Sequence, residues 1–448
     1  MKTALVVGMA KSGVGAAKLL SRTGWRVIAN DRRREIPGLD QALAGFVVAM
    51  RLGEAPEALL DGVELVVISP VIPMTAPFVR LAQTRGIEVI SEIELGYRYA
   101  KARFVCITGT NGKTTCTALT GAMFQKGYRE GRTFVLGNIG VAITEHALDT
   151  AENDIVVAET AALQLEGNAR FHASAAGICN ITEDHIDHFG SMESYIAAKC
   201  KIFDNQTETD YAVLNYDDPQ TRAIAGSVCA RRYWFSRREE VGQGMFLRDG
   251  VLIFRDGGRD APLLHRDEIR IPGAHNLENA MLSALLALCM GVSPAAVVET
   301  LKTFPGVEHR LEFVRELDGV AYINDSKGTN PASTMRAIEA MDRPIVLILG
   351  GYDKHADFSE LFRSFGGAVK ACVILGQTKS QLLTEAEAEG CGALCHPAER
   401  FEDAVRLARS LSRPGDAVLL SPACASWDMF ENFEERGRVF KELVNAFV

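Results

Sequence analysis

The 448-residue sequence has no excess of positive charge, no metal-type pairing of cysteines and no apolar run long enough to cross a membrane. Its net charge of −9 gives no electrostatic footprint for nucleic acid. The ten cysteines are scattered, and no second pair follows Cys391 and Cys395, so thiols in a reducing cytoplasm are the simplest account. The most apolar stretch, residues 277–292, contains Glu278 and is predicted to be a buried helix.

The first apolar run is too short for a signal peptide, so we expect a cytoplasmic protein without nucleic-acid partners or membrane insertion. The length favours about three domains. The 47% hydrophobic content is ample for their cores. A Phe-Pro-Gly break at 304–306 marks one boundary, and the predicted domains are residues 1–98, 99–305 and 306–448.

A glycine-rich turn at residues 109–115, reading GTNGKTT, carries the clearest chemical signal. An apolar run at 104–108 precedes it, and apolar residues at spacings of three and four follow it. Strand, glycine loop and helix are the context of a phosphate-binding loop, in which Lys113 reaches the terminal phosphates and Thr114 ligates Mg²⁺. The loop is shorter than the standard pattern, since Ile107 stands where a glycine is expected. An ordinary polar turn before a helix is the alternative.

A second strand is predicted at residues 154–159 and ends in the carboxylate of Glu159. Phosphate-loop proteins hold Mg²⁺ with an acid at the end of a neighbouring parallel strand. A metal ligand is therefore favoured here over a solvated strand end.

The segment 180–188, NITEDHIDH, gathers ionisable side chains around His185. A zinc site is one interpretation, but no cysteine partners follow; a charged loop with satisfied hydrogen bonds is the other. In the helix predicted at 195–203, Lys199 lies between small residues, whereas Lys201 has the pattern of an ordinary surface lysine.

The glycine-rich turn at residues 8–15 follows the first predicted strand and opens a helix. Asp31 follows about twenty positions later, as in dinucleotide-binding Rossmann units. Ala10 replaces the second glycine of that pattern, which weakens an assignment to NAD. Arg32 and Arg33 suit a phosphate or a diphosphate sugar at the same crevice, and a purely structural turn is the alternative.

The last third of the chain repeats the doubly wound pattern. Short apolar runs predicted as strands each end in a polar or glycine-rich turn: residues 322–323, 345–349, 371–375 and 417–420. Ligands collect at the carboxyl ends of strands in open parallel sheets. The charged residues at these ends are Asp325, Lys327 and Lys354.

Together, these stretches resemble the Mur ligase family, in order and in spacing, over the whole chain. The similar stretches are GTNGKTT (109–115), GNIG (137–140), NITEDHIDH (180–188), AAK (197–199), HNLEN (275–279), EHRLE (308–312), NDSKGTNP (324–331) and SPACASWDMFENFEERG (421–437). The short phosphate loop is this family's own variant. The resemblance implies an α/β fold of three domains: a Rossmann-like N-terminal domain, a P-loop-type central ATPase and a Rossmann-like C-terminal domain.

The activity that the resemblance implies is ATP-driven amide formation through an acyl phosphate, giving ADP and phosphate. The chain lacks the D-N-P-R type motif of members that add a diamino acid, and SPACAS with NFEERG is similar to those that add D-glutamate. The implied substrates are therefore UDP-N-acetylmuramoyl-L-alanine and D-glutamate, in peptidoglycan precursor synthesis. The implied cofactors are ATP and two Mg²⁺ ions, and we expect a monomer.

The resemblance also assigns roles to residues. Thr114 and Glu159 would hold the first Mg²⁺, and His185 and Lys199 the second, with Lys199 converted to a carbamate by CO₂. The catalytic set is Lys113, Glu159, His185 and Lys199. ATP contacts are assigned to Gly109, Thr110, Asn111, Gly112, Lys113, Thr114, Thr115, Asn276, Asn279, Arg310, Asp325 and Lys327. Substrate contacts are assigned to Lys11, Ser12, Arg32, Arg33, Asn138, His185, Thr329, Lys354, Ser426 and Phe433. His309 is interpreted as structural more readily than as catalytic.

The chain departs from the family pattern at two places. Thr-Ala-Ala-Leu-Gln at 160–164 stands where Ser-Ser-Phe-Gln is usual, which puts hydroxyl contacts at Ala161 and Ala162 in doubt. GGYDK at 350–354 replaces GGDGK. The remaining alternatives are a folate-type ligase, a nicotinamide-dependent dehydrogenase and a non-catalytic nucleotide switch. The first domain argues against a folate-type ligase, and Ala10 argues against a dehydrogenase. A nucleotide switch does not explain Lys199.

Overall fold

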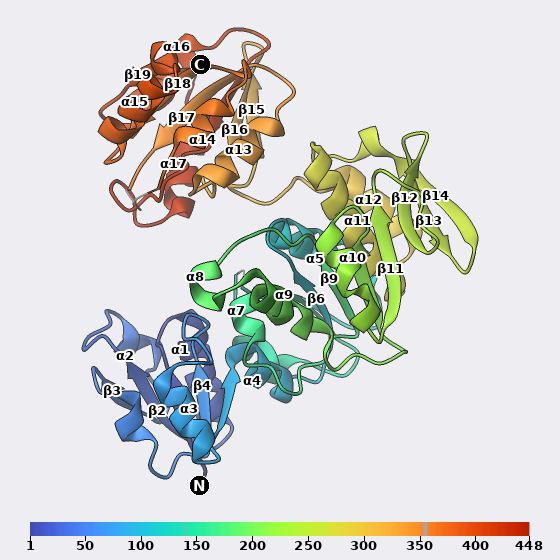
Figure 1. Ribbon diagram of the computed structural model, residues 1–448, viewed down its shortest axis with the longest axis vertical. Helices are drawn as coiled ribbons and strands as arrows, with labels where there is room; N and C mark the ends of the chain where they lie inside the picture. Colours follow the sequence, from blue (N-terminus) through green and yellow to red (C-terminus); the bar gives the residue numbers. More distant parts are fainter. Residues whose placement is uncertain (139, 353–355, 448) are drawn as a thin grey trace. The chain divides into compact units, whose positions relative to one another are not determined.

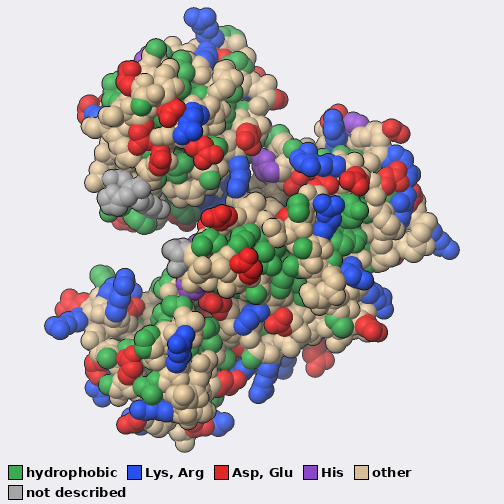
Figure 2. All heavy atoms as spheres, in the orientation of Figure 1, with side chains coloured by type: hydrophobic (Ala, Val, Ile, Leu, Met, Phe, Trp, Pro, Cys, Tyr) green, Lys and Arg blue, Asp and Glu red, His purple; other side chains and the backbone are tan. Residues whose placement is uncertain are grey.

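The computed structural model describes residues 1–138, 140–352 and 356–447, which form two compact units (Figure 1). The larger unit comprises residues 1–269 and 276–304, and the smaller comprises 270–275 and the chain from 305 onward. No helix among the described residues has the length and apolar content needed to cross a bilayer. On the face drawn in Figure 2, Lys and Arg side chains are interspersed with Asp and Glu on each unit.

The first sheet of the larger unit has parallel strands in the order β3-β2-β1-β4-β5. The strands are β1 Thr3–Val7, β2 Arg26–Asp31, β3 Val48–Leu52, β4 Leu65–Ile68 and β5 Glu88–Ser91, and the helices are α1 Lys11–Arg22, α2 Leu39–Ala42, α3 Pro77–Thr84 and α4 Glu92–Tyr99. Successive residues of β1 enter hydrophobic clusters on opposite faces, as expected of a strand covered on both sides. The strand order reverses between β1 and β4, so a crevice is expected at their carboxyl ends.

The second sheet has the order β14-β13-β12-β11-β10-β9-β6-β8-β7, parallel from β7 to β12 and antiparallel beyond. The strands are β6 Arg103–Thr108, β7 Thr133–Gly137, β8 Ile155–Glu159, β9 Ala175–Ile178, β10 Tyr211–Asn215, β11 Arg231–Ser236, β12 Gly244–Arg248, β13 Val251–Asp256 and β14 Arg259–His265. The helices are α5 Lys113–Gly127, α6 Ile143–His146, α7 Ala162–Leu165, α8 Ile186–Phe189, α9 Met192–Cys200, α10 Pro219–Ile224, α11 Ala274–Cys289 and α12 Pro294–Thr303. Strands β11 to β14 extend this sheet beyond β10.

The smaller unit contains the third sheet, in the order β15-β16-β20-β17-β18-β19. Its strands are β15 Glu312–Leu317, β16 Val320–Asn324, β17 Ile345–Gly350, β18 Val369–Leu375, β19 Cys395–Pro397 and β20 Ala417–Leu420, and its helices are α13 Pro331–Glu339, α14 Ser359–Arg363, α15 Lys379–Ala388, α16 Phe401–Leu411 and α17 Phe433–Asn445. β15 pairs antiparallel with β16, while the other pairs are parallel. The predicted three-domain α/β fold is confirmed; the boundaries near residues 98 and 305 stay predictions.

Helix α4 ties the first two sheets into one unit. The carboxylate of Glu94 is fully buried and accepts hydrogen bonds from the backbone N–H groups of residues 169–171 and from Arg98. Glu92 accepts from the backbone N–H and the hydroxyl of Thr144 at the start of α6. Buried carboxylates with several donors hold two elements in one register, because each unmade hydrogen bond is costly.

Candidate active site

The phosphate loop joins β6 to α5 in the conformation that its glycines permit. Gly112 has a φ of 83°, a left-handed value, and an added Cβ would lie 2.3 Å from Oδ1 of Asn279. The first intrahelical bond of α5 runs from the Cys116 N–H to the Gly112 carbonyl. The N–H groups of Lys113 to Thr115 precede that bond and point out of the helix start, where an anion binds favourably.

Asn180 braces the loop from the side. Its carbonyl accepts from the Thr110 N–H at 2.9 Å, and its side-chain oxygen accepts from the Asn111 N–H at 3.0 Å. The side-chain amide of Asn180 in turn donates to the Asn111 carbonyl at 3.2 Å. The N–H groups of Thr110 and Asn111 are thus engaged within the protein, so we expect the phosphates to be held by the donors from Gly112 onward.

The ammonium of Lys113 lies over the loop itself. It donates to the carbonyls of Gly109 and Thr110, each at 2.9 Å. An ammonium has three donors and a flexible stem, so it can exchange carbonyls for phosphate oxygens without a change in the backbone.

Glu159 offers a buried, half-satisfied carboxylate beside the loop. It ends β8, which pairs with β6 so that Glu159 lies opposite Ile107, and its side chain is only 2% exposed. Oε1 accepts from the Asn138 amide at 2.9 Å, whereas Oε2 is buried and has no hydrogen-bond partner among the described residues. A buried carboxylate oxygen without a donor fits a cation, and an oxygen donor suits Mg²⁺. Thr114 is buried at the start of the adjacent helix.

Lys199 lies on α9, is 1% exposed, and has its Nζ 4.3 Å from the centroid of the Tyr195 ring. Burial, with a smaller contribution from the charge of Lys113, lowers the pKa of Lys199 to about 7. A neutral amine is therefore available, and that is the form that reacts with CO₂. Lys201 is half-buried and donates to the Glu166 carbonyl at 2.7 Å, so its expected description as an ordinary surface lysine is wrong.

His185 precedes α8 with a left-handed φ of 53° and is exposed. Its ring lies 6.4 Å from the Tyr195 ring, so Tyr195 is a shared neighbour of His185 and Lys199. Tyr195 also reaches the Thr110 hydroxyl at 3.2 Å, which connects both residues to the phosphate loop. Within the described residues, His185 is not part of a three-residue cluster of His, Cys, Asp or Glu ligands, which removes support for the zinc interpretation.

The N-terminal part of α11 packs against the phosphate loop through Asn279. Asn279 donates to Oδ1 of Asn276 at 3.1 Å, which confirms that the two share one helix face. The Cys116 thiol of α5 donates to Oδ1 of Asn279 at 3.3 Å. Asn279 therefore lies beside the phosphate loop, and Asn276 lies next to it on the same helix face.

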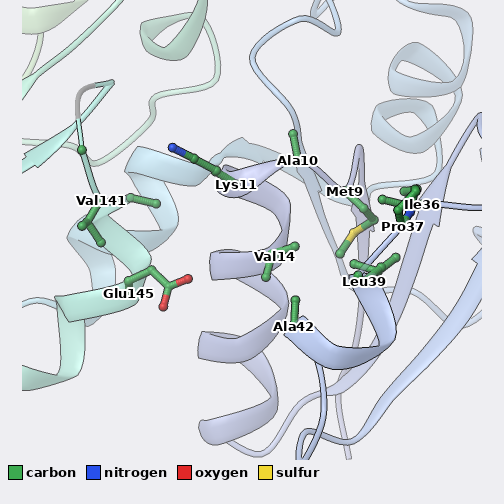
Figure 3. A pocket seen from close by; sticks show the side chains of 13 residues that line it. Met9, Ala10, Lys11, Val14, Ile36, Pro37, Leu39, Ala42, Val141 and Glu145 are labelled. Atoms are coloured by element: carbon green, nitrogen blue, oxygen red, sulfur yellow. The ribbon is translucent and has the colours of Figure 1, made fainter. Parts of the chain in front are cut away.

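Four of the residues assigned to UDP, Lys11, Ser12, Arg32 and Arg33, lie at the carboxyl end of the first sheet, whereas Asn138 follows β7 of the second. Lys11 lines a cavity of about 360 Å³ whose walls come from helices α1, α2 and α6 and the loops next to them. Figure 3 shows Met9, Ile36 and Leu39 on one side of it and Val141 on the other. Ser12 lies beside Lys11 at the start of α1. An apolar crevice with a cation at its edge suits a base joined to phosphates.

At the carboxyl end of β2, one acidic and one basic residue already pair with each other. Asp31 accepts from the Met9 N–H at 2.8 Å and from Arg33 at 3.0 Å. The bond to Arg33 holds the pKa of Asp31 well below its usual range. Asp31 is thus not a free acceptor for a ribose, which weakens the NAD alternative further. Arg33 could contact a phosphate only while it remains paired with Asp31. Arg32 is exposed.

In the smaller unit, the assigned nucleotide residues meet at the end of β16. Asp325 accepts from the Ser421 hydroxyl at 2.7 Å and from the Leu311 N–H at 3.2 Å. Burial raises the pKa of the Asp325 carboxyl to about 6, against the hydrogen bond from Ser421. Nε of Arg310 is buried without a partner among the described residues. Lys327 lies over the Phe433 ring, with Nζ 5.4 Å from its centroid.

The residues assigned to D-glutamate follow the same strand ends. Thr329 lies in the loop after β16, Ser426 is buried in the loop after β20, and Phe433 opens α17. Lys354 lies outside the described residues. The structure thus brings Thr329, Ser426 and Phe433 to the carboxyl ends of β16 and β20.

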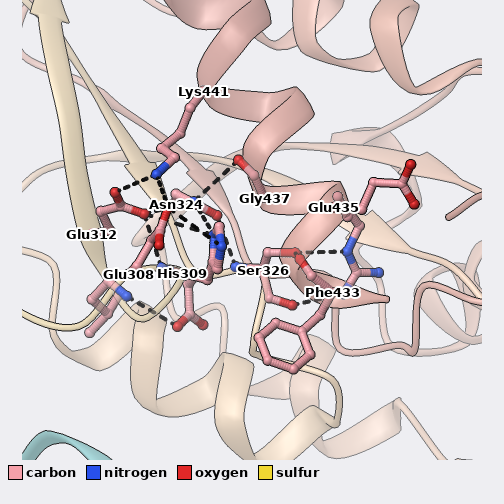
Figure 4. Close-up of polar contacts among 12 residues, drawn as sticks. Glu308, His309, Glu312, Asn324, Ser326, Phe433, Glu435, Gly437 and Lys441 are labelled. Carbon is pink, nitrogen blue, oxygen red and sulfur yellow. Dashed lines mark hydrogen bonds and ion pairs between the residues drawn. The ribbon is translucent and has the colours of Figure 1, made fainter. Parts of the chain in front are cut away.

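His309 has a structural environment. Its Nδ1 lies 2.9 Å from the Asn324 amide, and its backbone has a left-handed φ of 64° (Figure 4). His309 forms the one cluster with metal-ligand spacing found within the described residues, together with Glu308 and Glu312. Lys441 already bridges both carboxylates, so a cation is present without a metal.

Three residues important to this geometry carried no role at the sequence level: Asn180, Tyr195 and Arg436. Asn180 and Arg436 stand within stretches that resemble the family, which was the available signal. Their spacing alone gives no reason to connect them to a loop far away in the sequence.

Comparison with known proteins agrees with this geometry. Family models match residues 2–91 (Mur ligase MurD-like, N-terminal domain), 107–287 (Mur ligase middle domain) and 309–424 (Mur ligase, glutamate ligase domain). UDP-N-acetylmuramoylalanine–D-glutamate ligases of Alkaliphilus metalliredigens and Clostridioides difficile are each 41% identical to this chain, over 99% of it and 98% of their own length.

Solved structures show the same fold at low identity. The UDP-N-acetylmuramate–alanine ligase of Thermotoga maritima superposes with a TM-score of 0.62 at 19% identity, covering 100% of this chain and 99% of its own. MurF of Acinetobacter baumannii gives 0.59 at 17% identity, covering 98% and 93%. Full-length identity above 40%, together with the matched domains, means that the chain belongs to the Mur ligase family.

Proposed function

We propose that this chain is an ATP-dependent ligase that joins D-glutamate to UDP-N-acetylmuramoyl-L-alanine and releases ADP and phosphate. The observation that carries the proposal is the full-length match to D-glutamate ligases, at 41–43% identity for the first two relatives. The site supports the reaction class, since a phosphate loop lies beside a buried acid and a buried lysine. The substrate carboxylate accepts the terminal phosphate of ATP, and the amine of D-glutamate then displaces phosphate from the acyl phosphate.

Bringing a carboxylate to a triphosphate requires local positive charge. Two like charges 4 Å apart repel by about 1 kcal/mol in water but about 4 kcal/mol at an effective dielectric near 20. Lys113 and the helix start of α5 supply part of the compensation. The net charge of −9 makes these local groups essential, because the protein as a whole repels anions.

Two metal positions are proposed beside the loop. Thr114 and Glu159 would hold the first ion, and the unsatisfied Oε2 of Glu159 supports this. His185 and Lys199 would hold the second ion, and their shared contact with Tyr195 supports this. Magnesium bound there would neutralise charge that develops on the transferred phosphate.

Lys199 can ligate a metal only after modification, because an ammonium has no free lone pair. We propose that its neutral amine adds to the carbon of CO₂, releasing one proton and leaving a carbamate whose oxygens are the ligands. Burial supports this, since it favours the neutral amine and shields the product from water.

Substrate binding is divided between the two units. Lys11, Ser12, Arg32, Arg33 and Asn138 would hold the UDP part, and Thr329, Lys354, Ser426 and Phe433 would hold D-glutamate. Asn276 and Asn279 in the larger unit, and Arg310, Asp325 and Lys327 in the smaller, would hold the base and ribose of ATP. We propose domains at residues 1–98, 99–305 and 306–448 that follow this division.

The decisive experiment measures phosphate release from ATP with UDP-N-acetylmuramoyl-L-alanine and a panel of amino acids. Release that depends on D-glutamate is expected. Release with L-glutamate or meso-diaminopimelate instead would assign the chain to a different reaction of the family.

A further inference from the structure

Arg436 is the largest side chain in the smaller unit that is fully enclosed, at 1% exposure. It lies on α17, and each of its N–H donors is used. Nε donates to the Ser326 hydroxyl at 3.0 Å, and Nη2 donates to the Ser326 carbonyl at 2.8 Å. Nη1 and Nη2 both donate to the Cys424 carbonyl at 3.1 Å, and Nη1 also donates to the Ala425 carbonyl at 3.2 Å. A guanidinium has five N–H donors, so its hydrogen-bonding capacity is filled.

The acceptors belong to two loops that carry assigned binding residues. Ser326 lies between Asp325 and Lys327 after β16, and Cys424 and Ala425 directly precede Ser426 after β20. The Ser326 hydroxyl also donates to the Phe433 carbonyl at 2.8 Å, which joins the first loop to the start of α17 (Figure 4). One side chain thus fixes both loops relative to the helix that carries Phe433.

The end of a third strand, β17, also lies next to the Arg436 guanidinium. The Tyr352 N–H after β17 donates to the Ala425 carbonyl at 2.9 Å. A Cβ added to Gly351 would lie 2.2 Å from that carbonyl and 3.3 Å from Nη1 of Arg436. The ends of β16, β17 and β20 therefore meet around the guanidinium, with no space for a larger residue at 351.

The charge of Arg436 has no hydrogen-bonded carboxylate, since all its acceptors are neutral oxygens. Burial lowers the pKa of Arg436 to about 10, against the charges of Asp428 and Asp325, so the group stays protonated near neutral pH. A buried cation is a costly way to add stability, because well-packed apolar residues often serve as well. Its cost is explained if the charge and the fork geometry serve a bound anion.

We propose that Arg436 is a positioning residue for D-glutamate: it holds the loops after β16 and β20 in their binding geometry and adds a buried positive charge toward the dicarboxylate. This inference rests on the proposed function. Arg436 acts through Thr329, Ser426 and Phe433, which are the residues assigned to contact the amino acid. The UDP part binds in the other unit, so its affinity should not depend on Arg436.

The test compares Arg436→Lys, which keeps the charge and removes the fork, with Arg436→Met, which keeps the volume and removes the charge. Arg438→Met is the matched control, because Arg438 is exposed on the same helix. In Arg436→Lys, we expect KM for D-glutamate to rise at least about tenfold, because two of five donors are lost. KM for UDP-N-acetylmuramoyl-L-alanine should stay within about twofold of the control. Arg436→Met should raise KM for D-glutamate further than Arg436→Lys.

If Arg436 contributes only to the stability of the fold, the expected result is different. Its substitution would then lower the melting temperature and the fraction of active enzyme, hence kcat, with KM for D-glutamate unchanged; that result overturns the inference. If Arg436→Met does not fold, the comparison of KM for D-glutamate between Arg436→Lys and Arg438→Met still tests the inference. Parent enzyme without D-glutamate-dependent phosphate release would refute the proposed function itself. If the parent is active and Arg436→Lys has the same KM for D-glutamate as Arg438→Met, this inference alone is refuted.

Discussion

Among single residues, the site differs in which buried polar atoms are satisfied. Arg436 has every donor paired, whereas Oε2 of Glu159 and Nε of Arg310 have no partner within the described residues. A buried polar atom without a hydrogen bond costs roughly 1–3 kcal/mol. Such atoms are uncommon in native proteins and call for an explanation such as an ion or ligand. Six further buried atoms share this state among the described residues, but Glu159 and Arg310 are the two that are assigned to a metal and to the nucleotide.

Lys199→Ala is expected to reduce D-glutamate-dependent phosphate release by about 10²-fold or more, as when an electrostatic group is removed from a reaction site. Formate or acetate should restore part of the activity, because a small carboxylate can replace the oxygens of the carbamate in the space vacated by the side chain. In the parent enzyme, ¹³C NMR after exposure to ¹³CO₂ should show a carbamate signal that is absent from Lys199→Ala.

Lys201→Ala is the matched control, since Lys201 lies two residues away and donates to the Glu166 carbonyl. It should retain the carbamate signal and most of the activity. A parent enzyme that is active but acquires no label, with no rescue of Lys199→Ala by carboxylates, would contradict the assignment of a carbamate.

For single residues of the site, some positions could be predicted from the sequence and others could not. The phosphate loop, Glu159 and the Asn276–Asn279 pair follow from local patterns, because their geometry is fixed by one strand, one turn or one helix face. The engagement of Asn111 by Asn180 and the paired state of Arg33 did not follow. Those contacts depend on how distant segments meet, which no local pattern determines.

At the scale of elements, β5 and the helix α4 that follows it carry two carboxylates in opposite situations. Glu92 is buried against α6, and burial raises its pKa above the ordinary value. Glu88, at the start of β5, is bonded to Arg98 at 2.6 Å, which lowers its pKa. A raised carboxyl pKa in the folded state favours folding at low pH, and this contribution is lost as pH rises through the folded-state value. A lowered carboxyl pKa favours folding at pH values above the ordinary pKa, and this contribution is lost as pH falls through the folded-state value.

Glu92→Gln should therefore melt about 2–4 °C higher than the parent near pH 7.5, because the amide oxygen can still accept from Thr144 without a buried charge. The difference should shrink as pH falls toward the ordinary pKa of glutamate. Differential scanning calorimetry from about pH 8 to pH 5 measures both.

Glu88→Gln is the control of opposite sign. It should melt below the parent near neutral pH, since it loses the ion pair with Arg98. Because the pKa of Glu88 is lowered, the deficit should persist down to the ordinary pKa of glutamate and diminish only below it, so calorimetry of this variant extends to about pH 3. Melting temperatures of both variants that run parallel to the parent at every pH would contradict the assignment of these shifts.

Elements were predictable where their residues are buried. β1, β8 and β18 are apolar runs covered on both faces, and each was predicted from its sequence. β3 and β15 were missed because they are edge strands whose residues are mostly exposed or half-buried. Their positions depend on a neighbouring strand with an open edge, which a polar sequence does not reveal.

For the whole molecule, the assigned nucleotide residues are divided between the two units. Asn276 and Asn279 belong to the larger unit, whereas Arg310 and Asp325 belong to the smaller. The chain passes between the units only near residues 269–276 and 304–305. Each unit has its own core. We propose that a nucleotide bound by residues of both would fix one unit to the other.

Small-angle scattering should show this as compaction. With a non-hydrolysable ATP analogue, Mg²⁺ and UDP-N-acetylmuramoyl-L-alanine, the radius of gyration should fall toward the roughly 22 Å expected of one compact chain of this length. The UDP substrate alone is the control, because its assigned contacts all lie in the larger unit, and it should leave the radius unchanged. The forward scattering should give the mass of a monomer throughout. An unchanged radius with all ligands bound would mean that binding does not bring the units together, and the division of nucleotide contacts proposed above would then be wrong.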